Sequence, residues 1–167
     1  MAWPMKYTDY PKSVAQADST ACWAASLEWW LACMSPQRSP TPQNDLINRY
    51  VKYWDARQQI DGKDNPEYGT VSAENFVKIV SQPAISMEYL VCTVLDLQVI
   101  RQKLAKSPVM ITYYEPKVKG FHVNVIHSTN SDHSLGDINV MEPNGGRFES
   151  KDVRRFTTKK CLLSWAK

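Results

Sequence analysis

The sequence predicts an α+β domain in which an N-terminal helix packs on an antiparallel β-sheet. Helical patterns dominate the first part of the chain, whereas short β-rich runs separated by turn signals follow one another after residue 108. The chain has 167 residues, a length that suits a single domain over 1–167 with a sizeable hydrophobic core. The sequence shows no internal repeat and no low-complexity tract.

The leading helix is predicted over residues 22–34, after an extended arm over residues 1–15 that is rich in Pro, Tyr, Lys and Asp. The run that begins at Cys22 favours a helix and is apolar around most of its circumference, which predicts a buried helix. Asp18, Ser19 and Thr20 are residue types that cap helix N-termini. A cysteine in the first turn meets unpaired N–H groups and the positive end of the helix dipole, and both favour the thiolate.

The rest of the chain is predicted to form three more helices and four strands. The predicted helices cover residues 42–54, 73–81 and 95–106, and the strands cover 85–93, 109–114, 120–128 and 137–143. We expect Thr41 to cap the second helix with Pro42 in its first turn, and Ser72 to cap the third. Residues 55–71 are polar and are predicted to form a loop.

Composition excludes several classes of function. The net charge is +3, and the basic pairs Arg154-Arg155 and Lys159-Lys160 fit a solvated face better than a nucleic-acid stripe. An apolar run of about eighteen residues, as a membrane span needs, does not occur. The cysteines form no CxxC pair and no zinc-finger spacing, so we expect no metal, cofactor, nucleic acid or membrane as a ligand.

Cysteines and histidines supply the candidate reactive groups. Three of the four cysteines, Cys33, Cys92 and Cys161, are predicted to pack in the core, and a disulfide among them stays open. A nucleophilic thiol at Cys22 needs a base and a third group that orients the base. Its candidate partners are the three histidines, His122, His127 and His133.

The position of each histidine separates them. His133 lies in a polar turn and is expected to be solvated. His122 and His127 lie on one predicted strand at an odd spacing, so they point to opposite faces. His122 follows Gly120-Phe121 at the start of the strand, where a side chain can project toward a cleft. The alternative is a structural His122 that bonds a backbone carbonyl in the sheet.

Gln16, five intervening residues and then Cys22-Trp23-Ala24 resemble the active-site segment of papain-like cysteine peptidases. In that family the glutamine side chain and the cysteine N–H form the oxyanion hole, and the cysteine heads a long central helix. The chain has Ser19-Thr20-Ala21 where the plant and lysosomal branch has Cys-Gly-Ser before the nucleophile. It is closer to compact bacterial branches: double-glycine leader peptidases, staphylococcal-type peptidases, and secreted effector or toxin peptidases.

The resemblance also implies the remaining catalytic residues. The histidine of the family follows a glycine at the start of a strand, as His122 does here with one extra residue. In the bacterial branches the next strand ends in Asp-Pro, and Glu142-Pro143 holds that place, so Glu142 would orient His122. Asn144 is the alternative third member. Glu142 to Gly146 can also be no more than a strand end and a turn, and Gly145-Gly146 fits turn chemistry.

The function expected from this pattern is that of a cysteine peptidase that cleaves a protein substrate. The nucleophile arrives by residue 22, which leaves no room for a long inhibitory pro-segment, and the first residues lack the apolar core of a signal peptide. We therefore expect a toxin or effector domain that is delivered by another route, acts in the target-cell cytoplasm and is restrained by an inhibitor or immunity protein. Otherwise the protein acts in the cytoplasm where it is made.

Two alternatives remain for the same scaffold. One is a related acyl-transfer enzyme, namely a glutamine deamidase, a transglutaminase or a peptidoglycan amidase. The other is an inactive relative that only binds.

Overall fold

The structure is a computed structural model that describes residues 3–54, 56–60, 63–116, 120–131, 137–156 and 160–167, with the side chains of 56–60 and 63–69 left aside. His133 and Lys159 therefore lie outside the described residues. The α-helices are α1 Cys22–Cys33, α2 Gln43–Arg49, α3 Ala73–Val80 and α4 Leu97–Leu104. Short 3-10 helices cover η1 Tyr7–Asp9, η2 Val51–Tyr53 and η4 Val153–Phe156.

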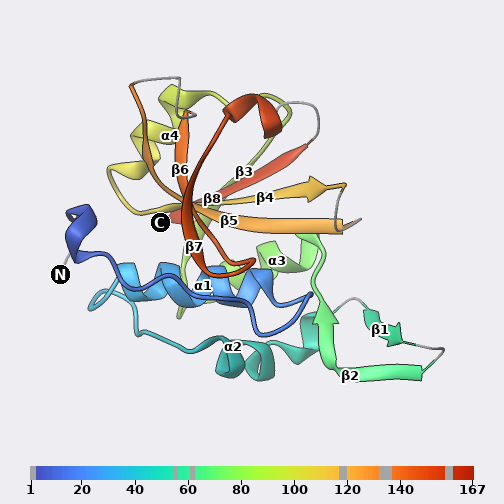
Figure 1. Ribbon diagram of the computed structural model, residues 1–167. Helices are drawn as coiled ribbons and strands as arrows, with labels where there is room; N and C mark the ends of the chain where they lie inside the picture. The colour runs from blue at the N-terminus through green and yellow to red at the C-terminus, as the bar shows by residue number, and fades with distance from the viewer. Residues whose placement is uncertain (1–2, 55, 61–62, 117–119, 132–136, 157–159) are drawn as a thin grey trace.

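One six-stranded antiparallel sheet organises the molecule, with strand order β3-β8-β4-β5-β6-β7. Its strands are β3 Met87–Cys92, β4 Val109–Glu115, β5 Gly120–Thr129, β6 Ile138–Glu142, β7 Arg147–Lys151 and β8 Cys161–Ala166. Helices α1, α2 and α3 lie on one side of the sheet, and α4 lies on the other side (Figure 1). The predicted α+β architecture, with the leading helix packed on an antiparallel sheet, is confirmed.

The leading helix is buried as predicted. It begins at Cys22, and ten of its residues are buried. Trp29 and Trp30 have no exposed surface, and each indole N–H finds a carbonyl, at 3.0 Å from Pro11 and 2.9 Å from Pro108. A buried indole that keeps its hydrogen bond contributes a large apolar surface without an unsatisfied donor. The helix is thereby fixed on the sheet.

The predicted cap of this helix is wrong. Ala21 occupies the N-cap position, and no side chain caps it. The Asp18 carboxylate instead accepts from the N–H of Thr20 at 2.6 Å and from its hydroxyl at 2.7 Å. A short acidic side chain that bonds the backbone two residues ahead closes a tight local turn. Asp18 therefore shapes the approach to Cys22 but does not cap α1.

The second predicted cap is also wrong, and the third is confirmed. Pro42 holds the N-cap position of α2, and Thr41 does not cap the helix. The N–H of Gln43 donates to the Glu28 carboxylate of α1 at 2.7 Å. A neighbouring helix therefore supplies the acceptor that the sequence predicted at Thr41. Ser72 caps α3 as predicted.

Residues 55–71 are not a loop in the described part of the chain. β1 Ala56–Ile60 and β2 Lys63–Thr70 form an antiparallel ribbon apart from the main sheet. The ribbon projects away from the rest of the molecule (Figure 1). Strand pairing satisfies the hydrogen bonds of backbone groups whatever the polarity of the side chains. The polar composition of this segment therefore wrongly indicated a loop. The signal that favours a hairpin is the Asp61-Gly62 dipeptide.

Strands β7 and β8 are not among the elements predicted from the sequence. β8 lies between β3 and β4 in the sheet, and its six residues are all buried. A strand that is buried on both faces has a continuous apolar sequence without the alternation typical of strands. Its sequence therefore cannot be distinguished from that of any other apolar segment. Within the described residues, no helix combines the length and the apolar character that crossing a bilayer requires.

Candidate active site

The thiol of Cys22 meets the ring of His122 where α1 packs against β5. The Cys22 side chain lies close enough to the His122 ring to raise the pKa of the imidazole through hydrogen bonding and charge. One turn further along α1, the hydroxyl of Ser26 donates to the carbonyl of Val123 at 3.2 Å. This bond ties the helix to the residue that follows His122, so the contact between sulfur and imidazole is set by the docking of two rigid elements.

His122 also contacts Glu142 of the neighbouring strand. Its Nε2 lies 2.6 Å from Oε1 of Glu142, which leaves Nδ1 as the ring nitrogen that can face the sulfur. Burial opposes a charge on the ring, but the hydrogen bonds and charges of Cys22 and Glu142 outweigh it and raise the pKa of His122 to about 9. The ring is therefore protonated at neutral pH.

Glu142 is the buried carboxylate at the end of β6. Burial favours its neutral form, but hydrogen bonds with His122 and Lys151 hold its pKa well below the usual range. The backbone N–H of Asn144 donates to its Oε1 at 2.9 Å, whereas the Asn144 side chain is exposed. Of the two candidates for the third position, Glu142 is the one that contacts the imidazole.

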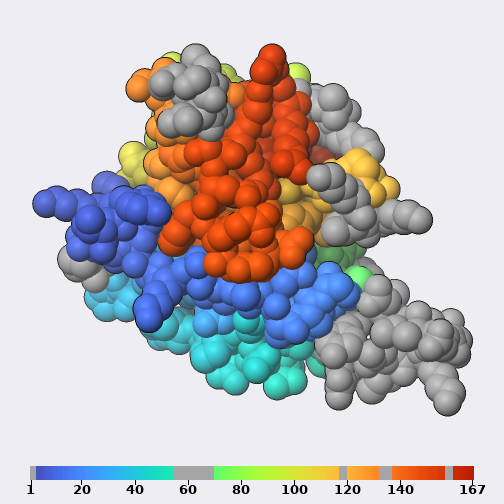
Figure 2. Space-filling model, viewed as in Figure 1, coloured from blue at the N-terminus to red at the C-terminus, as the bar shows by residue number. Residues whose placement is uncertain are grey.

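Gln16 lies on the N-terminal arm beside the end of β6. Its backbone N–H donates to the carbonyl of Pro143 at 2.9 Å, and Figure 2 shows the arm lying against the segment that follows β6. Its amide nitrogen donates to the carbonyl of Asp18 at 2.7 Å. An amide nitrogen carries two N–H groups, so one is left for another acceptor. The side-chain oxygen is buried without a hydrogen-bond partner among the described residues.

Two residues that the sequence reading missed hold this arm. Gln43 of α2 accepts from the N–H of Ala17 at 2.9 Å and donates to the carbonyl of Ala15 at 2.8 Å, so it clamps both neighbours of Gln16. Gly146 has φ +61°, and a Cβ there would lie 2.7 Å from the backbone nitrogen of Ala15. No local pattern marks Gln43, since its partners lie far along the chain. Gly146 was assigned to a turn, which the structure confirms.

The other three thiols lie in surroundings that disfavour the thiolate. None of the four cysteines forms a disulfide within the described residues, so the disulfide left open by the sequence is absent there. Cys33 and Cys161 are buried as predicted, and Cys92 is half-buried. Burial raises the pKa of Cys161 to about 11 and also raises the pKa values of Cys33 and Cys92. These three thiols are therefore poor nucleophiles at neutral pH.

His127 is separate from the site. It packs between Tyr10 and Trp29, at ring-centroid distances of 5.0 and 6.1 Å, on the face of the sheet that α1 covers. His122 points to the opposite face, beside Tyr113, as the odd spacing predicts. Burial lowers the pKa of His127 to about 4, so the ring is neutral. Across the described ranges, no cluster of His, Cys, Asp and Glu is arranged to hold a metal ion.

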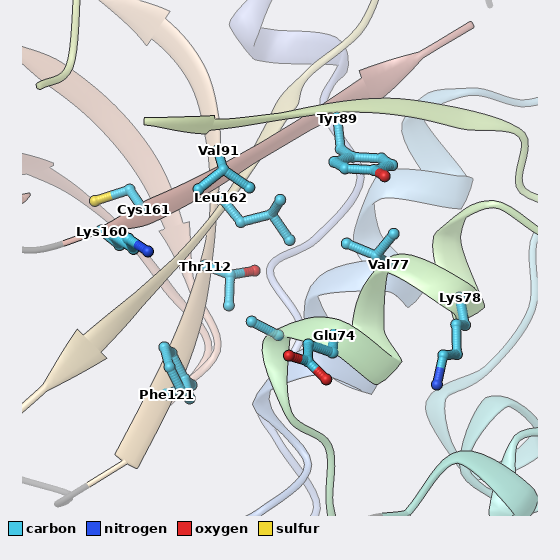
Figure 3. Close-up of a pocket in the computed structure, with 11 residues that line it drawn as sticks. Glu74, Val77, Lys78, Tyr89, Val91, Thr112, Phe121, Lys160, Cys161 and Leu162 are labelled. Atoms are coloured by element: carbon cyan, nitrogen blue, oxygen red, sulfur yellow. The ribbon is translucent and has the colours of Figure 1, made fainter. Parts of the chain in front are cut away.

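An apolar pocket opens between α3 and the sheet (Figure 3). Its volume is about 480 Å³, and it is lined by Val77 of α3, Val91 of β3, Leu162 of β8 and Phe121 of β5. Figure 3 shows α3 on one side of this pocket and the strands on the other. Phe121 directly precedes His122 on β5, but the lining of the pocket includes neither Cys22 nor His122.

Comparisons with known proteins identify a family and a similar fold. Residues 4–161 match the family described as papain-like cysteine protease AvrRpt2. The fold is similar to the peptidase domain of Streptococcus ComA, which is described as a bifunctional ABC transporter involved in a quorum-sensing pathway. That match has a TM-score of 0.57 and 14% identity, and covers 93% of this chain and 98% of the ComA domain.

A second structure, the Streptococcus mutans ComA peptidase domain with a small-molecule inhibitor, has a TM-score of 0.47 at 14% identity, over 93% of this chain and 98% of that one. Among curated proteins, none is significantly similar to this chain.

Proposed function

Because the chain belongs to the family of papain-like cysteine proteases described by AvrRpt2, we propose that Cys22, His122 and Glu142 form its catalytic triad and that Gln16 completes the oxyanion hole. The observation that carries this proposal is that the His122 ring contacts the Glu142 carboxylate at 2.6 Å and lies beside Cys22, whose side chain raises the pKa of the imidazole. The nucleophile, the base and the orienting carboxylate come from α1, β5 and β6, so three separate elements supply them.

The arrangement supports acyl transfer through a thioester. The Cys22 sulfur attacks the carbonyl carbon of the scissile peptide bond, and the carbonyl oxygen becomes an oxyanion. His122 gives its proton to the departing amine as the carbon–nitrogen bond breaks. A water molecule then attacks the thioester carbon and gives a proton to His122, and the carbon–sulfur bond breaks, which releases the carboxylic acid product and the Cys22 thiolate. Glu142 keeps the ring oriented and stabilises its charged form during both steps.

The oxyanion is stabilised by two N–H groups. The N–H of Cys22 lies in the first turn of α1, where backbone donors have no partner within the helix. The free amide hydrogen of Gln16 supplies the second. Donors aimed at the developing charge are worth about 3 kcal/mol each in comparable sites. Because Gln16 sits on an arm that is clamped on both sides, the donor needs little reorganisation during the reaction.

The pocket beside Phe121 suits an apolar side chain of an extended protein substrate. Its volume of about 480 Å³ accommodates a large aliphatic or aromatic group. Burial of such a group contributes about 1.5–3 kcal/mol. We infer that cleavage sites carry an apolar residue at one fixed distance from the scissile bond.

The decisive experiment compares the protein with its Cys22→Ala variant. We expect the variant to lose all peptide cleavage and its labelling by iodoacetamide at neutral pH, because Cys22 is the thiol that contacts an imidazole. Cys92→Ala is the matched control and should keep both properties. Retained labelling of Cys22→Ala would assign the reactive thiol elsewhere and refute the proposal.

Mass spectrometry of a lysate treated with either form identifies the reaction. New peptide termini with an enriched apolar residue near the cut support proteolysis and the pocket assignment. Release of ammonia or cross-linked products without new termini would instead identify the deamidase or transglutaminase alternative. Absence of any product difference between the two forms would identify a binding-only relative.

We also propose that the domain acts as a toxin or effector inside a target cell and is restrained by an inhibitor or immunity protein. Its support is the resemblance to secreted effector and toxin peptidases together with the match to the family described as papain-like cysteine protease AvrRpt2. Expression of the active domain in a susceptible host should slow growth, whereas expression of Cys22→Ala should not. Equal growth of the two strains would contradict this role.

A further inference from the structure

A buried lysine lies behind the carboxylate of Glu142. Lys151 ends β7, and Ile138 of β6 lies opposite it in the ladder. Since β6 alternates its faces, Lys151 points to the side that carries Glu142. Lys151 is only 5% exposed, which is uncommon for a lysine unless its charge is paired. Neither the sequence pattern nor the proposed mechanism gives this residue a role.

The ammonium group of Lys151 is surrounded by acceptors. Its Nζ lies 2.7 Å from Oε2 of Glu142 and 2.7 Å from Oδ1 of Asn124. Glu149 lies 3.1 Å away, and the hydroxyl of Tyr113 lies 3.5 Å away. The Glu142 carboxylate therefore bridges two cations, with Lys151 on one oxygen and the His122 ring on the other.

These contacts immobilise Glu142. Oε1 accepts from His122 and from the N–H of Asn144 at 2.9 Å, and Oε2 accepts from Lys151 and from the amide of Asn124 at 2.9 Å. With both oxygens held from two directions, the carboxylate cannot rotate without breaking charge-assisted hydrogen bonds. A glutamate side chain has one more rotatable bond than an aspartate, and these contacts restrict the rotation that this bond allows.

We propose that Lys151 is a positioning residue for the His122–Glu142 pair and that its charge sets the pH range in which the pair operates. This proposal rests on the function proposed above. Lys151 shares the Glu142 charge with the imidazole, and it therefore limits how strongly Glu142 retains the proton of His122. Without the ammonium group, the carboxylate would be both less constrained and fully available to the ring.

The other charged groups around the pair leave Lys151 as the dominant cation. The His122–Glu142 pair faces the Cys22 sulfur of α1 and the Tyr113 hydroxyl of β4. The Tyr113 hydroxyl stays neutral because burial raises its pKa. Glu115 and Arg155 act on Tyr113 from farther out. From β7, Glu149 contacts Lys151 and is itself paired with the exposed Arg147 at 2.9 Å.

The test is a direct titration of His122 by NMR in the Cys22→Ala background, where the protein contributes three histidines. In Lys151→Met the His122 titration midpoint should rise by about one pH unit, because a nearby positive charge is lost. Lys151→Arg, which keeps the charge, should restore the midpoint of the parent. A midpoint that does not move in Lys151→Met, or that moves equally in both variants, would overturn the proposal.

The Glu149→Gln variant tests the same effect of Lys151 on the His122 titration with the opposite sign. It replaces the first test if Lys151→Met does not fold. Glu149 partly neutralises the ammonium group of Lys151. Without this negative charge the positive potential at Glu142 increases, so the titration midpoint of His122 should fall by less than one pH unit. An unchanged midpoint would contradict the proposal. In the active protein, Lys151→Met should also lower kcat at least tenfold with little change in KM, and Lys151→Arg should recover part of the loss.

These outcomes are independent of the proteolytic assignment. Loss of cleavage in Cys22→Ala together with an unmoved His122 midpoint would refute the role of Lys151 alone. A moved midpoint in a protein whose Cys22→Ala variant still cleaves would refute the proposed triad and leave the electrostatic coupling intact.

Discussion

In the proposed mechanism, the Gln16 side chain supplies one of the two donors of the oxyanion hole. The side chain is half-buried. It donates one amide hydrogen to the carbonyl of Asp18, and the second amide hydrogen does not contribute to the stability of the fold. A side chain of this kind contributes to the transition state rather than to stability.

Gln16→Ala should therefore lower kcat by about 10²- to 10³-fold with little change in KM or in the melting temperature. Gln98→Ala, an exposed glutamine on α4, is the matched control and should behave as the parent. Steady-state kinetics on a peptide substrate check this. A loss of less than threefold for Gln16→Ala would remove this residue from the oxyanion hole.

The N-terminal arm is positioned by elements that contain no catalytic group. Gln43 of α2 clamps Ala15 and Ala17, and the turn between β6 and β7 brings Gly146 against the backbone of Ala15. Because backbone lies directly behind the missing side chain, any Cβ at Gly146 must move the arm that carries Gln16.

Gly146→Ala should lower kcat by about 10- to 100-fold, since small displacements of a catalytic donor are costly. Gly145→Ala is the matched control. Its φ of +86° is equally unfavourable for alanine, but its Cβ would meet only the flexible end of the Arg147 side chain. Both variants should lose about 1–2 kcal/mol of stability from backbone strain. Equal kinetics in the two variants would show that the arm does not position Gln16.

The whole molecule responds to pH through two histidines with opposite shifts. The raised pKa of His122 adds stability that is present below pH 6.5 and is lost as the pH rises through about 9. The lowered pKa of His127 adds stability that is present above pH 6.5 and is lost as the pH falls through about 4. The combined contribution of His122 and His127 to the free energy of unfolding is therefore greatest near pH 6.5.

His127→Phe should flatten the acid side of this profile. The ring would still pack against Tyr10, Trp29 and Phe148 but could not take up a proton. Between pH 6.5 and 4 the parent should lose about 3 kcal/mol more of its free energy of unfolding than the variant. Chemical denaturation at several pH values measures this, and parallel loss in both proteins would show that another group controls acid unfolding.

Local patterns in the sequence predicted the elements whose signal is contained in a few neighbouring residues. The apolar run from Cys22 predicted the buried helix, and the alternation around His122 predicted its strand and its face. The spacing of Gln16 and Cys22 indicated the family. The same kind of reasoning placed caps at Asp18 and Thr41, where a local turn and a carboxylate from another helix decide otherwise.

The sequence by itself thus determined the α+β class, the leading helix and the candidate residues Gln16, Cys22, His122 and Glu142. Only the tertiary structure decided which groups surround them: Lys151 and Asn124 on the Glu142 carboxylate, Gln43 and Gly146 on the arm, and Phe121 at an apolar pocket. Their partners lie on strands and helices whose order in the sheet follows from burial of the whole core. Hydrophobic periodicity specifies each element and its inward face, but a contact between polar side chains exists only once those elements have packed together.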